Sequence, residues 1–231
     1  SFNLGKSLWL PELEYYIFDD VRFVSGVKSC SYTVDAEEAF WNMDREESPN
    51  LGYKIPLGMG GAQSIPPKDK LFTLRAEMVR RIESVGIPVR YHHHEGGSAG
   101  QVEIELLFDT LTQTADSIMV AKYIIRNTAT EYNKTVTFMP KPLYGDEGCG
   151  LHFHIYFTDG ERSLFLDPQG YGGLNKKGHH FIGGLLKHTS AIMGFCNCTT
   201  NSYRRFASEG LAAPVNMSFS VGNRTAAVRI P

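Results

Sequence analysis

The sequence predicts an α+β fold, with one domain built on a largely antiparallel sheet and flanking helices. Strand-like and helix-like segments alternate along the 231 residues, and no repeat, low-complexity tract or clear linker divides them. Apolar residues make up 42% of the chain and charged residues 21%, a balance that is ordinary for a folded domain and excludes wholesale disorder. A chain of this length can bury a sizeable core.

Each expected element has a local signal. Strands are predicted where short apolar or β-branched runs occur, at residues 13–18, 102–108, 150–157 and 226–230. Helices are predicted where apolar residues recur at helical spacing: residues 70–85 (ended by Gly86), a long helix capped by Asp109, and residues 181–195. Residues 50–69 and 170–178 are rich in turn-forming residues and are predicted as loops, the first an ordered loop or flap.

Charge and cysteine content exclude several classes of protein. The net charge of −2 offers no basic field to attract nucleic acid. No apolar run approaches the roughly 18–20 residues of a membrane span. The four cysteines form no C-x-x-C framework and are too sparse for a disulfide scaffold, so we expect small buried thiols in a cytoplasmic protein. They are Cys30, Cys149, Cys196 and Cys198.

Three predicted strands carry acids or histidines two residues apart. The pairs are Glu12 and Glu14, Glu103 and Glu105, and His152 and His154. Residues i and i+2 of a strand share one face, so each pair points one way. Taken singly, a pair also fits a solvated face or structural histidines. In one sheet, together with the segment His92-His93-His94-Glu95, they would line a shared concavity suited to Mg²⁺ or Mn²⁺ rather than zinc.

Several arginines follow near the C-terminus. They are Arg204, Arg205, Arg224 and Arg229. Arginine binds carboxylate and phosphate through a bidentate fork, and a carboxylate metal site with arginines is typical of phosphoryl transfer. The glycine-rich segment 145–150 leaves room for a ligand, but it lacks the G-K-[ST] of a Walker A loop. The residues alone therefore indicate a metal-dependent enzyme that acts on anionic substrates.

A series of motifs also resembles type I glutamine synthetase, from residue 10 to the end of the chain and in family order. The series begins with Pro11-Glu12-Leu13-Glu14 and ends with Asn223-Arg224 through Arg229-Ile230-Pro231. Between them lie the matching residues 50–54, 93–95, 99–103, 138–142, 145–154, 171–174, 182–184 and 199–203. So many motifs in one order are not expected by chance.

The resemblance implies an ATP-dependent ligase that joins ammonia to the γ-carboxylate of L-glutamate and gives glutamine. The reaction passes through γ-glutamyl phosphate, which ammonia then attacks. The resemblance also implies two or more Mg²⁺ or Mn²⁺ ions per site and a homo-oligomer of stacked hexameric rings. The expected fold is a glutamine-synthetase-type catalytic domain, whose largely antiparallel sheet lines the active site.

Residue roles follow from the matched positions. Three acids resemble the ligands of a metal that helps to bind glutamate: Glu14, Glu95 and Glu103. Two residues resemble the ligands of a second metal, on the nucleotide phosphates: Glu12 and His152. Glutamate-binding positions match Glu147, Gly148 and Arg205. Nucleotide-binding positions match His154 and Arg229. Arg205 and Arg224 match the catalytic arginines, the latter stabilising the transferring phosphoryl group.

The departures from the family pattern leave alternatives open. Ala212 stands where the family has a glutamate that takes a proton from ammonium, and Glu209 is the nearest carboxylate. Asn is common where Glu147 stands. The chain begins after the family's N-terminal β-grasp domain and stops before a further metal-site glutamate, so we expect residues 1–231 to be a single incomplete catalytic domain, inactive alone. The alternatives are a γ-glutamyl ligase that uses another amine and a non-catalytic structural or regulatory relative.

Overall fold

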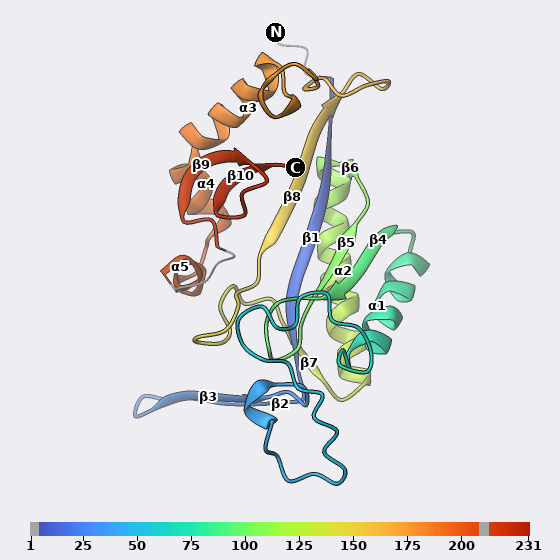
Figure 1. The fold of residues 1–231 in the computed structure, drawn as a ribbon, viewed down its shortest axis with the longest axis vertical. Helices are drawn as coiled ribbons and strands as arrows, with labels where there is room; N and C mark the ends of the chain where they lie inside the picture. Colours follow the sequence, from blue (N-terminus) through green and yellow to red (C-terminus); the bar gives the residue numbers. More distant parts are fainter. Residues whose placement is uncertain (1–4, 208–212) are drawn as a thin grey trace.

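The main sheet is built around one long strand, β1 (Lys6–Phe18) (Figure 1). The computed structural model describes residues 5–207 and 213–231. β1 lies between β5 (Gln101–Leu106) and β8 (Leu151–Thr158), and β4 (Val89–His94) extends the sheet beyond β5. Two short strands, β6 (Asp109–Thr110) and β7 (Thr135–Thr137), also pair with β1. All these pairings are antiparallel, which confirms the predicted fold class.

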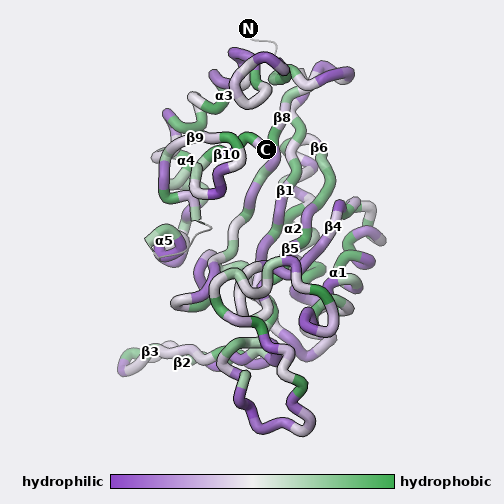
Figure 2. Tube along the Cα trace, in the orientation of Figure 1, coloured by the Kyte–Doolittle hydropathy of each residue, from purple (hydrophilic) through white to green (hydrophobic). Residues whose placement is uncertain are grey.

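The hydrophobic core lies on one face of this sheet, under α1 (Phe72–Ser84) and α2 (Leu111–Glu131) (Figure 1). Leu13 of β1 and its partner Ile104 of β5 are both almost fully buried in it. The two helices add the apolar side chains Leu74, Met78, Ile82, Ile118, Ala121 and Ile125. In the middle of β1, the hydrophobic Leu13 stands between the hydrophilic residues Glu12 and Glu14, and Figure 2 shows the hydropathy along the chain. Because a strand has a period of two, the acids between the core residues point to the opposite face.

The C-terminal third of the chain forms a separate group of elements beside β8 (Figure 1). It contains α3 (Lys176–Lys187), α4 (Thr189–Cys196), α5 (Thr200–Ala207) and the parallel pair β9 (Asn216–Val221) and β10 (Ala226–Ile230). Two 3₁₀ turns complete the set of helical segments in the described residues: Phe40–Asn42 and Tyr171–Gly173. A hairpin of β2 (Asp20–Ser25) and β3 (Cys30–Asp35) projects away from the main sheet.

Two predicted helices differ from those observed. The expected helix over residues 181–195 is two helices, α3 and α4, which meet at His188. Asp109 does not cap the long helix: it belongs to β6, and Thr110 precedes the helix without a side-chain cap. The carboxylate of Asp109 instead accepts the backbone N–H of Thr110, a local bond that competes with capping.

Three of the four cysteines are exposed, so the expectation of buried thiols is wrong for all except Cys149. The exposed ones are Cys30, on the projecting hairpin, and Cys196 and Cys198, at and beyond the end of α4. Solvent reaches these positions because they lie on peripheral elements rather than against the sheet. Among the described residues, no helix is both long enough and apolar enough to cross a membrane.

Replacing Ile104 by alanine should lower the free energy of unfolding by about 2–5 kcal/mol, because it opens a cavity behind the sheet. Chemical denaturation of the full-length protein measures this change. Met119→Ala on α2, whose side chain is 68% exposed, is the matched control and should cost much less. Equal losses for the two variants would contradict the assigned core.

Candidate active site

Carboxylates and imidazoles of four strands share the sheet face that α1 and α2 do not cover. Glu12 of β1 lies opposite Glu105 of β5 on one side and His152 of β8 on the other. One step along, Glu14 lies opposite Glu103, which in turn lies opposite His93 of β4. We call this surface the acid face, and it comprises Glu12, Glu14, Glu103, Glu105, His93, His152 and His154. The register confirms that the three spaced pairs share one face.

Each histidine of β8 bonds to a glutamate of β1. In both cases the glutamate lies two residues further along β1 than the residue directly opposite the histidine. His152 Nε2 lies 2.9 Å from Glu14 Oε1, and His154 Nε2 lies 2.5 Å from Glu12 Oε1. Burial acts to raise the pKa of both glutamates, but these hydrogen bonds and the nearby positive charges outweigh it and hold both pKa values below normal. The same contacts raise the pKa of His154 and, against its burial, that of His152.

A second group joins Glu95, Glu103 and His93. One ligand atom of each lies within 4.8 Å of the others. His93 Nδ1 is 3.3 Å from Glu95 Oε1, and its Nε2 is 3.6 Å from Glu103 Oε1. Burial, and then repulsion from Glu14 and Glu103, raise the pKa of Glu95 to about 7. Burial likewise raises the pKa of Glu103, and contact with Glu103 raises that of His93 to about 9.

The donor chemistry of the acid face fits a hard divalent cation. Carboxylate oxygens with an occasional imidazole nitrogen are the ligands that Mg²⁺ and Mn²⁺ prefer. Of the ligands that the resemblance implies for one metal, Glu95 and Glu103 lie together, and Glu14 is near enough to raise the pKa of both. Glu12 groups with His154 and Glu105, whereas His152 bonds to Glu14.

The ligand set that the resemblance implies leaves out three residues of these groups. They are His93, Glu105 and His154, and the last of these matches a nucleotide-binding position. The signals of the first two were present in the sequence, since Glu105 has the same spacing of two as the other pairs and His93 lies in the histidine run. Only the strand register shows that His93 and Glu105 point to the acid face.

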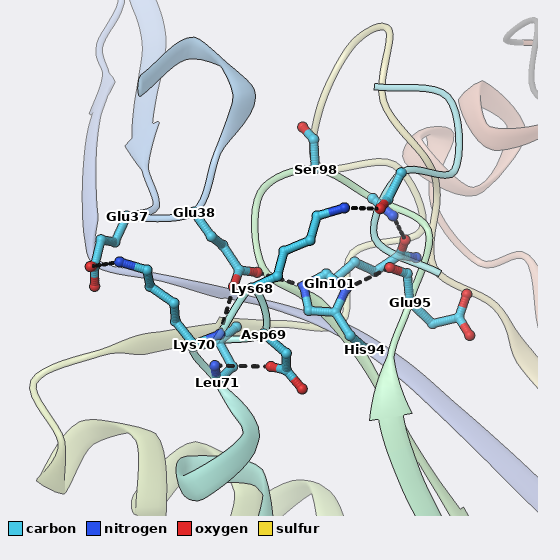
Figure 3. A network of polar contacts seen from close by, with 12 residues as sticks. Glu37, Glu38, Lys68, Asp69, Lys70, Leu71, His94, Glu95, Ser98 and Gln101 are labelled. Carbon is cyan, nitrogen blue, oxygen red and sulfur yellow. Dashed lines mark hydrogen bonds and ion pairs between the residues drawn. The ribbon is translucent and has the colours of Figure 1, made fainter. Parts of the chain in front are cut away.

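The backbone around Glu95 is fixed by a buried histidine (Figure 3). His94 is fully buried, and its Nδ1 lies 2.7 Å from the Glu95 carbonyl oxygen. A carbonyl can only accept, so His94 Nδ1 carries the proton. His94 Nε2 bonds to Glu38 Oε1 at 2.6 Å, and the Glu95 N–H donates to the Gln101 carbonyl at 2.8 Å. Both peptide groups of Glu95 are therefore held.

The predicted flap lies directly on this segment. Gly61 N–H donates to the Gly96 carbonyl, and Gln63 N–H donates to the His94 carbonyl. A Cβ at Gly61 would lie 2.4 Å from the Glu95 carbonyl oxygen, so only glycine permits this approach. Lys68 Nζ donates to the Gly60 carbonyl and closes the loop on itself (Figure 3). Residues 59–63 thus help to position Glu95.

Two arginines act electrostatically on different glutamates of the acid face. Arg205, on α5, packs its side chain against Gly148, where an added Cβ would lie 2.9 Å from its Cγ. Its charge contributes to the low pKa of Glu14. Arg229, on β10, contributes in the same way to the low pKa of Glu12. Arg224 is exposed in the turn between β9 and β10, and no contact seen among the described residues joins it to the acid face.

The loop that carries Glu147 and Gly148 is held in place by hydrogen bonds to buried side chains. Asp146 accepts hydrogen bonds from Ser98 Oγ at 2.7 Å and from the Glu147 N–H at 2.8 Å. The Tyr16 hydroxyl donates to the Glu147 carbonyl, and Gln101 Nε2 donates to the Gly148 carbonyl. Burial raises the pKa of the Glu147 carboxyl despite nearby Lys141. Ala212 and Glu209 lie outside the described residues.

Glu103→Gln should weaken Mn²⁺ binding at least about tenfold, because it removes a charged oxygen ligand. In the wild type, Mn²⁺ should raise the melting temperature by relieving repulsion on the acid face. Calorimetric titration and thermal melts of the full-length protein test both statements. Glu161→Gln, at an exposed loop position, is the matched control. Unchanged Mn²⁺ affinity in Glu103→Gln would show that this carboxylate is not a ligand.

His94→Phe should lower Mn²⁺ affinity by about tenfold or more, since residues that orient metal ligands commonly have effects of this size. His94→Asn keeps a donor near the Nδ1 position and should recover part of the affinity. The control is His188→Phe, on an exposed histidine. Loss of thermal stability with normal Mn²⁺ affinity would reduce His94 to a purely structural residue.

Mn²⁺ affinity should rise as the pH increases from about 6 to about 8. Glu95, with its pKa raised to about 7, is partly protonated at neutral pH, and His93, with its pKa raised to about 9, is mostly protonated. A metal must displace these protons, so binding releases them and strengthens as they leave. Titrations in buffers of different ionisation enthalpy count the protons. A pH-independent affinity would contradict this coupling.

Comparisons with known proteins identify the family to which this chain belongs. Residues 3–231 match the family model for the catalytic domain of glutamine synthetase. A glutamine synthetase of Frankia alni is 51% identical over 223 residues, which cover 96% of this chain and 46% of the relative. That of Pseudomonas aeruginosa is 42% identical over 233 residues, with 100% and 49% covered. The chain thus spans about half the length of these relatives.

Solved structures show the same fold. A Plasmodium falciparum glutamine synthetase matches with a TM-score of 0.84 at 28% identity, over 97% of this chain and 44% of that one. A ligand-free GmaS matches with a TM-score of 0.72 at 23% identity, over 98% and 46% of the two chains, and shares the fold. The family model matches nearly the whole of this chain. The chain therefore belongs to the glutamine synthetase family and corresponds to its catalytic domain.

Proposed function

We propose that the full-length protein joins ammonia to the γ-carboxylate of L-glutamate, using ATP and forming γ-glutamyl phosphate on the way to glutamine. The observation that carries this proposal is the acid face itself, with Arg205 at its Glu14 end and Arg229 at its Glu12 end. Carboxylates that can hold divalent cations between two arginines suit a reaction between a carboxylate substrate and a polyphosphate. Family membership gives this arrangement its reaction class, an ATP-dependent ligase.

Five residues hold the metal ions. Glu14, Glu95 and Glu103 hold one cation, and Glu12 and His152 take part in holding a second. Mg²⁺ or Mn²⁺ at these positions would neutralise the charge of the transferring phosphate. The assignment is supported by the contacts of Glu95 with its acidic neighbours, which keep its pKa high while no cation is bound. His152 must then exchange its bond to Glu14 for the metal.

The remaining residues bind the two substrates. Arg205 binds glutamate, beside the anchored loop of Glu147 and Gly148. His154 and Arg229, at the Glu12 end, bind the nucleotide phosphates. Arg224 stabilises the transferring phosphoryl group and has to approach from the exposed β9–β10 turn. Each of these roles needs a donor that faces an anion, which arginine and histidine supply.

The full-length protein acts as a homo-oligomer in the cytoplasm. Support for the oligomer comes from the projecting hairpin, whose apolar side chains are exposed. They include Val21, Phe23, Val24, Val27 and Tyr32, and exposed apolar patches of this kind mark interaction surfaces. The four free cysteines are compatible with a reducing compartment.

A γ-glutamyl ligase that uses another amine is the second candidate. Glu147 favours it, because this half-buried carboxylate lies beside the proposed glutamate site and would attract a cationic amine. Ala212 points the same way, since it removes the acid that the family uses to deprotonate ammonium. In a non-catalytic relative, the changes at Glu147 and Ala212 would have no effect on a reaction, so no other residue would have to make up for them.

The deciding experiment measures phosphate release from ATP by the full-length protein with Mg²⁺ or Mn²⁺ and L-glutamate. Release that depends on ammonium supports glutamine formation, and release that depends on a primary amine instead supports the second candidate. Glu103→Gln should abolish either activity, and Glu161→Gln should retain it. Metal binding without release for any amine would leave the non-catalytic relative.

A further inference from the structure

Glu105 is the carboxylate of the acid face that lies outside the proposed set of metal ligands. Its side chain is completely buried, and it lies directly opposite Glu12 across β1 and β5. Like charges at directly opposite positions destabilise an antiparallel pair. Burial makes this worse, because a buried charge needs a close partner. The position therefore calls for a positive charge between the two carboxylates.

Arg90 satisfies only one oxygen of Glu105. Its Nη1 donates to Glu105 Oε1, while its side chain remains 48% exposed. The pairing of β4 with β5 is irregular between Val89 and Tyr91, and such a bulge re-aims the side chain at the irregular position. Glu105 Oε2 is buried and has no hydrogen-bond partner among the described residues.

Tyr91, the neighbour of Glu105 on β4, does not fill this gap. Burial, and then a polar contact of the hydroxyl with the Glu105 carboxylate, raise its pKa, so the hydroxyl stays protonated. Even so, Oε2 of Glu105 has no hydrogen-bond partner among the described residues. An unpaired buried carboxylate oxygen is costly. Oε2 of Glu105 is thus a buried ligand atom without a hydrogen-bond partner, on a strand that is paired on both sides.

Two further ligand atoms lie around the Glu105 carboxylate. An oxygen of Glu105, an oxygen of Glu12 and a ring nitrogen of His154 all lie within 4.8 Å of one another. Two carboxylates and one imidazole form a donor set for Mg²⁺ or Mn²⁺. His152 is not part of this group, because it bonds to Glu14.

We propose that Glu105, Glu12 and His154 form a binding site for a divalent cation, with Glu105 Oε2 as a ligand and Arg90 holding the other oxygen aside. The site differs from the one assigned to Glu12 and His152, because it uses a buried carboxylate of β5. Its physiological role rests on the proposed function, since the nucleotide phosphates would lie at this end of the acid face. Its existence does not, because cation binding can be measured without turnover.

A competing arrangement needs no cation. If His154 is protonated, its charge compensates Glu12, and Arg90 compensates Glu105, so that two negative and two positive charges balance. The two arrangements differ in what Arg90 does. Beside a cation, the guanidinium is a repelling charge, so removing it strengthens binding. In a network of two ion pairs, removing it has no effect on a metal.

The test measures the binding of Mn²⁺ alone to the full-length protein. Calorimetry gives the affinity, and electron paramagnetic resonance measures the Mn²⁺ that remains free. Glu105→Gln is nearly isosteric and should weaken one class of Mn²⁺ site at least about tenfold. Arg90→Gln should tighten the same class several-fold. Glu161→Gln, exposed and remote, is the control and should match the wild type.

Wild-type Mn²⁺ binding by Glu105→Gln would overturn the proposal and leave Glu105 as a partner of Arg90 only. If Glu105→Gln does not fold, Arg90→Gln decides: tighter binding supports the cation site, and unchanged binding overturns it. The proposed function can fail separately. Absence of phosphate release with any amine, combined with loss of Mn²⁺ binding in Glu105→Gln, would refute the reaction and keep the site.

Discussion

Two pairs of carboxylates face each other across β1 and β5, and the sheet can form only if their repulsion is compensated. Glu12 lies opposite Glu105 and Glu14 lies opposite Glu103, and both β5 acids are buried. Positive partners arrive from β8 and β4, as imidazoles and as Arg90. The opposite face of the same strands buries apolar side chains under α1 and α2. This hydrophobic packing holds the register that brings like charges together.

The side-chain atoms that share protons in the histidine–glutamate contacts between these strands are also the atoms that could bind a divalent cation. His154 and Glu12 share one short bond, and His93 lies between two carboxylates. A cation must therefore replace protons rather than fill an empty space. The carboxylates themselves have little freedom to move, because their strands are fixed from behind and Glu95 is held by His94 and the flap. If a cation binds as proposed, the exchange of protons for metal would then require only local changes at these side chains.

The sequence predicted the features that depend on local periodicity. The spacing of Glu12 and Glu14 indicates a shared strand face, and the apolar spacing over residues 70–85 indicates α1. It did not predict β4, because a run of histidines has no strand pattern, or the β2–β3 hairpin, whose residues show almost no alternation in burial. Which histidine bonds to which glutamate depends on the register of β8 against β1, more than 130 residues apart in the chain. Such non-local pairings leave no trace in local spacing.

The acid face also has a direction. Consecutive positions on one face of a strand are about 7 Å apart, so Glu12 and Glu14 offer two adjacent charges rather than one merged cluster. Arg205 acts at the Glu14 end and comes from α5, whereas Arg229 acts at the Glu12 end and comes from β10. In the proposed reaction the amino acid would lie at the first end and the nucleotide at the second. The proposed reaction would therefore need both sets of groups, because the arginines of the C-terminal elements supply the charge that binds anions and the carboxylates of the sheet supply the ligands for cations.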